Sequence, residues 1–186
     1  MNELIKDLGL LINATLIATP PLLLAALGSC FSERSGVVNI GIEGMMTIGA
    51  FTGAVMGLTT GNGWIAFFCA GLAGALFGLI HAFACISCHA DQTIAGTAIN
   101  FLGPGLALFL CKAMYSNSSD TPAMDPSCKL PKLFEGVFPT GSFWSNVLNV
   151  YAVAYLVFIL AFICWFVFYK TRFGAHLRAV GEHPEA

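Results

Sequence analysis

Two cysteines and a histidine form the most recognisable chemical motif in this sequence. Cys85-Ile-Ser-Cys88-His89 has the spacing that attaches a c-type haem. However, the thiols close an apolar run with no evident second axial ligand, and a zinc site would need a second ligand pair nearby. The orientation predicted below also puts them on the cytoplasmic side, whereas such haem is attached outside the cytoplasmic membrane. We therefore expect no haem, no metal and no other cofactor.

Acid–base and nucleophilic chemistry have little support. His81 lies inside an apolar run, where a histidine either relays protons or bonds another helix, and we favour the hydrogen bond. The Walker A, GxSxG and HExxH motifs are absent. Neither a Ser/His/Asp set nor a carboxylate pair is arranged for catalysis. The sequence therefore predicts that the chain is not an enzyme.

Asn39 and Glu43 are polar residues at the mouth of a hydrophobic run, in SGVVNIGIEGMMTIGAF. A charge at the middle of a membrane helix costs about 2.5–3.5 kcal/mol on insertion scales. One interpretation is that Asn39 caps a helix beginning at Ile40, with Glu43 in its first turn at the positive end of the helix dipole. The other is a broken helix whose polar groups face a central pathway, as in transporters. The residues alone leave both open.

The composition indicates that these residues belong to a protein embedded in a lipid membrane. Of the 186 residues, 57% are hydrophobic and 10% charged, against about 25% charged in soluble domains. Two stretches, Leu8–Ser32 and Gly44–Ala90, contain no Asp, Glu, Lys or Arg, and the second is too long for one span of about 20 residues. We predict an all-α, polytopic bundle of transmembrane helices in contact with lipid. A net charge of −2 gives no basic field for nucleic acid.

The apolar runs divide into five predicted spans. Thr59-Thr60-Gly61-Asn62-Gly63 splits the long uncharged run, and Pro20-Pro21 breaks the first span. The spans are Leu8–Phe31, Ile40–Thr59, Trp64–Ile86, Thr93–Met114 and Val147–Tyr169. Gly49, Gly53, Gly57, Gly74 and Gly78 are spaced for close helix packing.

Basic residues predict the orientation of these spans. Lys170, Arg172 and Arg178 follow the last span, which places that end in the cytoplasm by the positive-inside rule. Counting back, residues 115–146 form an outer loop and residues 87–92 an inner one. We expect one transmembrane domain over residues 1–186.

Three segments resemble one known family. Phe31–Phe51 (FSERSGVVNIGIEGMMTIGAF), Asp91–Asn100 (DQTIAGTAIN) and Thr171–Ala186 (TRFGAHLRAVGEHPEA) resemble bacterial ABC importer permeases of the branched-chain amino acid, simple sugar and nucleoside permease family, nucleoside-type subgroup. The resemblance runs in order over essentially the whole chain, with His183 where Asn is usual. Members continue well beyond this point, so we expect the chain to be the N-terminal portion of a permease.

The resemblance implies a permease subunit of an ATP-driven importer for nucleosides or simple sugars, in the bacterial cytoplasmic (inner) membrane. Its partners would be cytoplasmic ATPase subunits, a second permease subunit, alike or different, and an extracytoplasmic substrate-binding protein. The ATPase-docking motif would begin in the coupling segment, residues 171–186, with Gly181, Glu182, Pro184, Glu185 and Ala186. We also hypothesise that four side chains near the inner end of the pathway contact substrate: Asn39, Glu43, Gln92 and Asn100.

Two rival functions remain open. One is an ion-coupled secondary transporter or channel that uses Glu43, His81 and Asp91. The other is a non-functional, truncated permease. An adjacent ATPase gene and a gene for a binding protein would favour the ABC importer over both.

Overall fold

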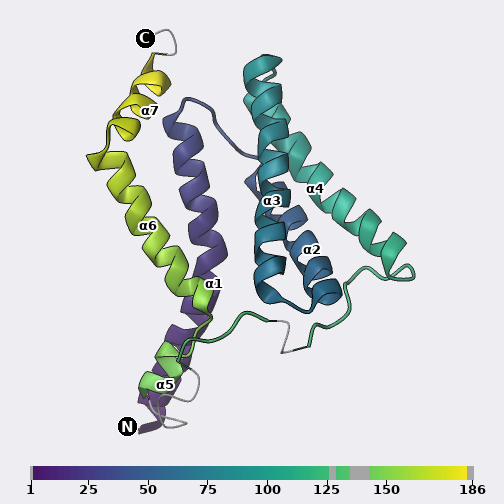
Figure 1. The fold of residues 1–186 in the computed structure, drawn as a ribbon, viewed down its shortest axis with the longest axis vertical. Coiled ribbons are helices and arrows are strands. Elements are labelled where there is room, and N and C mark those ends of the chain that lie inside the picture. Colours follow the sequence, from purple (N-terminus) through teal and green to yellow (C-terminus); the bar gives the residue numbers. More distant parts are fainter. Residues whose placement is uncertain (1, 126–128, 135–142, 184–186) are drawn as a thin grey trace. The chain divides into compact units, whose positions relative to one another are not determined.

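The protein is helical throughout the part that the structure describes, residues 2–125, 129–134 and 143–183 of a computed structural model (Figure 1). The helices are α1 (Asn2–Arg34), α2 (Ile42–Thr60), α3 (Gly63–Ala82), the π-helical turn η1 (Phe83–Ser87), α4 (Gln92–Met114), α5 (Phe143–Leu148), α6 (Ala152–Lys170) and α7 (Arg172–Glu182). Five segments are long and apolar enough to cross a membrane. The all-α, polytopic prediction is confirmed.

The chain divides into two compact units, which are described separately. One contains Met1–Gly28 and Leu130–Leu177, and the other Ser29–Lys129 and Arg178–Ala186. The second unit contains α2, α3 and α4 with the end of α7, and it holds most of the predicted site residues.

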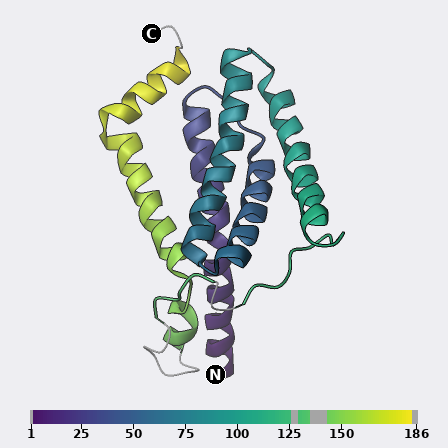
Figure 2. The same cartoon turned by 45° about the vertical axis from the view of Figure 1, so that its right-hand side comes forward.

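A tight turn joins α2 to α3 within the second unit, and the two helices lie side by side (Figure 2). Gly61 ends α2 in the left-handed region, with φ +65°, and its N–H donates to the Gly57 carbonyl. The Asn62 side chain then caps α3 by accepting the Trp64 N–H at 2.9 Å. The turn predicted from the Thr-Thr-Gly-Asn-Gly cluster is therefore present.

Glycines set the approach of α2 to α3. A Cβ at Gly49 would lie 3.1 Å from the Ala70 carbonyl oxygen, and one at Gly53 3.1 Å from the Ala70 Cβ. Gly57 lies close to the sulfur of Met124, and Gly74 and Gly78 make looser contacts with Met45. Since lipid tails are as apolar as the helices, the hydrophobic effect does not bring the helices together. Close approach of the backbones instead stabilises the pair through van der Waals packing.

Helices α2 and α4 also cross at glycines, and their backbones approach more closely than those of α2 and α3. A Cβ at Gly44 would overlap the carbonyl oxygen of Ile99, and one at Gly103 would overlap the carbonyl oxygen of Gly44. Below this crossing α2, α3 and α4 form a small apolar core of four residues, Ile48, Phe77, Ile99 and Ala107. The sequence prediction missed this crossing, although two glycines seven residues apart on α4, Gly96 and Gly103, were a visible signal of a flat helix face.

The unit formed by residues 1–28 and 130–177 differs from prediction in two places. Pro20 and Pro21 lie inside a continuous α1 and do not break it. The last span begins at Ala152 rather than Val147, because the chain leaves the helix after Leu148. At this break the Asn149 carbonyl accepts the Asn13 side-chain N–H at 3.3 Å, while the buried Oδ1 of Asn149 has no hydrogen-bond partner among the described residues.

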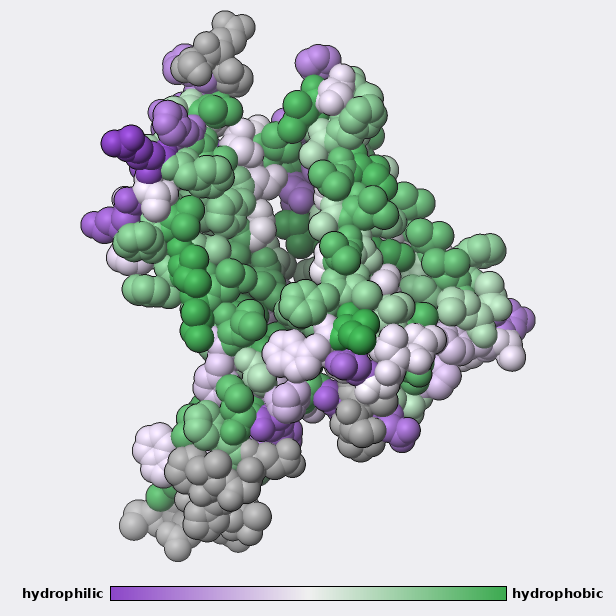
Figure 3. Space-filling view, viewed as in Figure 1, coloured by the Kyte–Doolittle hydropathy of each residue, from purple (hydrophilic) through white to green (hydrophobic). Residues whose placement is uncertain are grey.

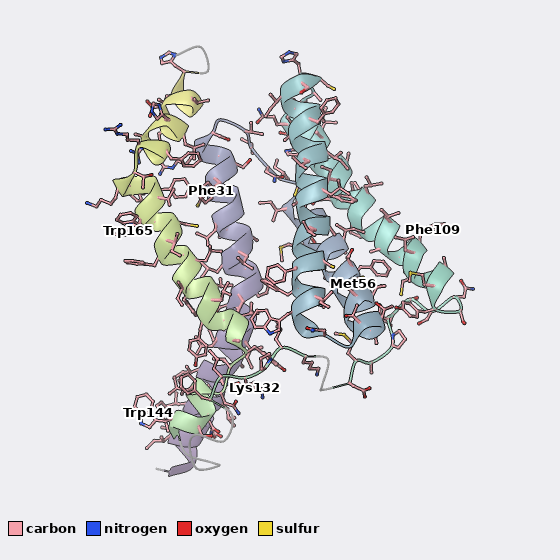
Figure 4. The ribbon with its side chains drawn as sticks, viewed as in Figure 1. Phe31, Met56, Phe109, Lys132, Trp144 and Trp165 are labelled. Atoms are coloured by element: carbon pink, nitrogen blue, oxygen red, sulfur yellow. The ribbon has the colours of Figure 1, made fainter. Side chains whose placement is uncertain are left out.

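The helix flanks are apolar and uncovered. Figure 3 shows apolar side chains along the flanks of α4 and α6. Phe109 of α4 and Trp165 of α6 project from these flanks (Figure 4) and are 67% and 48% exposed. In water such faces would be unfavourable, so the exposure fits a lipid environment.

Candidate functional site

The chain between α1 and α2 is not helical, and its residues 37–41 are named the entry segment. Within the hydrocarbon region of a membrane, backbone outside a helix is tolerated only where other protein groups or a water-filled cavity satisfy its N–H and C=O groups. The partners of this backbone therefore decide how the start of α2 is held.

Side chains from α3 and α4 bind the first part of the entry segment. The Val38 N–H donates to Oε1 of Gln92 at 2.8 Å. The Val38 carbonyl oxygen lies 3.4 Å from Nε2 of His81, which is 2% exposed. A proton on Nε2 makes that nitrogen the donor. His81 thus bonds backbone between spans, where the sequence suggested a partner on another helix.

Asn100 of α4 binds the second part of the segment at two points. Its Nδ2 donates to the Ile40 carbonyl at 2.9 Å, and its Oδ1 accepts the Gly44 N–H at 2.8 Å. Gly44 is the third residue of α2, so its N–H has no partner within the helix. Asn100 therefore caps α2 from a neighbouring helix, because Gly41 at the capping position has no side chain that could accept this N–H.

Asn39 does not make the capping contact that one interpretation of the sequence gave it, and its role in the pathway stays a prediction. The helix begins at Ile42 rather than at Ile40, and Asn39 lies three residues ahead of it. Its Oδ1 accepts the Gly41 N–H at 3.1 Å, and its Nδ2 lies 3.7 Å from the Met45 sulfur. The prediction that Asn39 caps a helix starting at Ile40 is wrong, because two further residues are needed to turn the chain into α2.

Glu43 lies in the first turn of α2, and its side chain is exposed. Met46 and Ala50, on the same face, are also exposed. The uncovered faces of α3 and α4 carry more exposed apolar residues, such as Leu72 and Phe101, which are 71% and 78% exposed, and these two helices contain no Asp or Glu. An acidic residue in a span faces protein or water rather than lipid, so Glu43 marks the side of α2 that is suited to a polar pathway.

The remaining polar candidates have structural partners. Asp91 caps α4, its Oδ1 accepting the N–H groups of Thr93 and Ile94 at 2.9 Å each. The sulfur of Cys85 lies 3.7 Å from Nε2 of His81, while Cys88 is exposed beyond η1. Within the described ranges, no three His, Cys, Asp or Glu side chains gather as a metal site would require.

The predicted coupling residues lie at or beyond the C-terminal end of the described chain. Gly181 and Glu182 are the last two residues of α7, and Glu182 is exposed. Pro184, Glu185 and Ala186 lie outside the described residues. A Cβ at Gly181 would overlap the carbonyl oxygen of Arg34, so this glycine packs against the end of α1.

Spanning helices with a polar, non-helical entry into one of them are typical of membrane transport proteins. The match to a family model agrees with this class: the chain belongs to the family described as "Branched-chain amino acid transport system / permease component", which matches residues 11–186. It is accordingly a multi-pass protein of the cytoplasmic membrane.

Three relatives are similar over nearly the whole chain. The guanosine ABC transporter permease protein NupQ of Bacillus subtilis is 44% identical over 99% of this chain and 59% of its own length. The nucleoside ABC transporter permease protein NupC of Lactococcus lactis is 33% identical over 99% and 59%. The putative glucose ABC transporter permease protein TsgC13 of Haloferax volcanii is 36% identical over 94% and 52%.

The chain thus spans just over half the length of these relatives. None of the known experimental structures matches it significantly.

Proposed function

We propose that the chain is part of the permease subunit of an ATP-driven importer for nucleosides or simple sugars, and that it contributes to the translocation pathway. Family membership supports a transport role, and the names of the relatives support nucleosides and sugars as the substrate classes. ATP would be hydrolysed by separate cytoplasmic subunits that dock on the coupling segment. A second permease subunit and an extracytoplasmic binding protein would complete the assembly.

The observation that carries the pathway proposal is the exposed side chain of Glu43 in the first turn of α2. The other three predicted substrate residues use their side chains on the entry segment: Gln92 binds Val38, Asn100 binds Ile40 and Gly44, and Asn39 binds Gly41. We infer that these three shape the pathway by fixing its backbone. Glu43 is then the residue of the four that is best placed to touch substrate.

The chemistry of the substrates fits such a carboxylate. Ribose and sugar hydroxyls are neutral donors, and a hydrogen bond to an ionised carboxylate is worth about twice a neutral one. Replacing Glu43 by Gln keeps the shape but removes the charge, which should lower substrate affinity about tenfold, or about 1.4 kcal/mol. If Glu43 only interacted with the helix dipole, the change would cost about 0.3–1 kcal/mol of helix stability and leave uptake almost unchanged.

The test is uptake of radiolabelled guanosine and glucose by cells that express the complete transporter with Glu43→Gln. Glu33→Gln is the matched control, since Glu33 is an exposed glutamate whose carboxylate accepts the Ser29 hydroxyl at 3.0 Å. We expect about tenfold slower uptake for Glu43→Gln alone, with equal protein in the membrane and equal basal ATP hydrolysis. Near-normal uptake would refute the role of Glu43 in the pathway.

The energy source for uptake, ATP or an ion gradient, distinguishes the proposed importer from an ion-coupled transporter. Uptake into ATP-loaded membrane vesicles should persist after a protonophore collapses the proton gradient, and should stop when ATP is withheld. The opposite pattern would replace the importer with the secondary transporter.

A further inference from the structure

We propose that Gly181 is a positioning residue that links the coupling segment to the entry segment through Gly36. The inference rests on the proposed function, because it takes α7 to be the element on which the ATPase docks. It adds a physical route by which a movement at that surface reaches the start of α2.

The route begins with a contact between two stretches of backbone. A Cβ at Gly181 would overlap the Arg34 carbonyl oxygen and lie 3.2 Å from the Gly36 nitrogen. A Cβ at Gly36 would lie 3.4 Å from both Cα and the carbonyl oxygen of Gly181. Gly36 also has φ +85°, a region that other residues rarely adopt. Because no side chain lies between them, no rotamer change can absorb a relative movement.

The chain that follows Gly36 is fixed by hydrogen bonds. The Val37 N–H donates to the Ser32 carbonyl at 3.1 Å, and the Ser32 hydroxyl donates to the Val37 carbonyl at 2.6 Å. The next residue is Val38, whose N–H and carbonyl face Gln92 and His81. A single residue, Val37, therefore separates the α7 contact at Gly36 from Val38, which the side chains of α3 and α4 bind. A displacement of Gly181 must either break the contact or move this segment.

The coupling role makes a prediction that packing alone does not. If the contact merely stabilises the fold, its loss should lower the amount of protein in the membrane and every activity together. If it transmits movement, its loss should separate ATP hydrolysis from transport. Discrete rearrangement of packed elements is how small shifts at one site reach another, and the evidence for such a route is a measured change at both ends.

The test compares Gly181→Ala with Gly71→Ala in the complete transporter with its ATPase subunits. Gly71 lies on α3, and a Cβ there would meet nothing within 4 Å, so it controls for the added methyl group. Uptake, membrane content, ATPase co-purification and ATP hydrolysis are measured for each variant. For Gly181→Ala we expect the ratio of uptake to ATP hydrolysis, at equal membrane content, to fall about tenfold relative to wild type. Gly71→Ala should match wild type in all four measurements.

Other outcomes overturn the link. Normal uptake by Gly181→Ala shows that the contact is dispensable. Loss of ATPase co-purification makes Gly181 a docking residue instead, which refutes the link and retains the proposed function. An unmodified transporter that binds no ATPase at all refutes the proposed function itself.

A second measurement needs no substitution and covers the case in which Gly181→Ala fails to accumulate. Amide hydrogen exchange of residues 37–41 is compared in the unmodified transporter with and without docked ATPase and a non-hydrolysable ATP analogue. The link predicts at least a threefold change in exchange at Val38 together with a change at Gly181. A change at Gly181 alone would refute it.

Discussion

Replacing Asn100 by Leu tests whether the entry segment depends on side chains from α4. Leucine has the same number and branching of side-chain heavy atoms as asparagine, so the change removes the two hydrogen bonds, to the Ile40 carbonyl and the Gly44 N–H, without opening a cavity. In water-soluble proteins each buried group left unsatisfied costs about 1–3 kcal/mol. Side-chain hydrogen bonds measured within membrane proteins are worth less, about 0.6 kcal/mol on average and up to about 1.7.

For two bonds the membrane values give a loss of about 1–3 kcal/mol in the free energy of unfolding. The control is Thr97→Ala, one turn earlier on α4, where an exposed hydroxyl bonds only the Thr93 carbonyl of its own helix. That change should lie within about 0.5 kcal/mol of wild type, as for surface positions in general. The difference between the two variants therefore exceeds the effect expected from an ordinary polar-to-apolar change on this helix.

The assay is reversible unfolding of the purified complete permease in mixed detergent micelles, followed by far-UV circular dichroism. Amide hydrogen exchange at Gly44 gives a local readout, and it should become faster in Asn100→Leu because the Gly44 N–H loses its acceptor. Equal unfolding free energies for Asn100→Leu and Thr97→Ala, with unchanged exchange at Gly44, would refute the capping of α2 by α4.

Two further predictions concern helix packing and orientation. Gly44→Ala should lower the free energy of unfolding by about 1–3 kcal/mol through overpacking, since its methyl group would overlap a backbone oxygen of α4, while Gly71→Ala should be neutral in the same assay; equal effects would contradict the close crossing. In a variant without native cysteines, an impermeant thiol reagent should label a cysteine at Ser118 but not one at Ser87 in intact cells. Both positions are exposed in the structure, so the reverse pattern would overturn the predicted orientation rather than reflect burial.

Sequence patterns predicted the number and type of spans. A run of apolar residues without charges can cross lipid only as a helix, because the bilayer offers no other partner for the backbone. That argument needs no knowledge of neighbours, and it holds for α1, α2, α3, α4 and α6. It failed at Pro20 and Pro21, where an uninterrupted helix accommodates both prolines. It also failed before Ala152, where residues 149–151 are not helical and the Asn149 carbonyl accepts a hydrogen bond from the distant Asn13.

The candidate site could be predicted only in part from the sequence. The types and positions of Asn39, Glu43, Gln92 and Asn100 indicated polar residues near one end of the spans, but not what each one binds. Gln92 and Asn100 lie more than fifty residues from their backbone partners, and no local pattern specifies a contact at that separation. Their assignment as substrate ligands stays a prediction, because an amide side chain has donors and acceptors that can bind either hydroxyls or peptide groups.

The sequence by itself therefore determined that the protein lies in lipid, that its fold is a bundle of membrane-spanning helices and that it resembles transport permeases. These conclusions follow from composition, from the length of the apolar runs and from contiguous motifs. Only the tertiary structure decided that α2 begins at Ile42, that Asn100 caps it from α4, and that Gly181 contacts the end of α1. The physical reason is the same in each case. A helix can satisfy its interior hydrogen bonds by itself, but its first N–H groups and the chain that leads into it need partners from elsewhere in the fold.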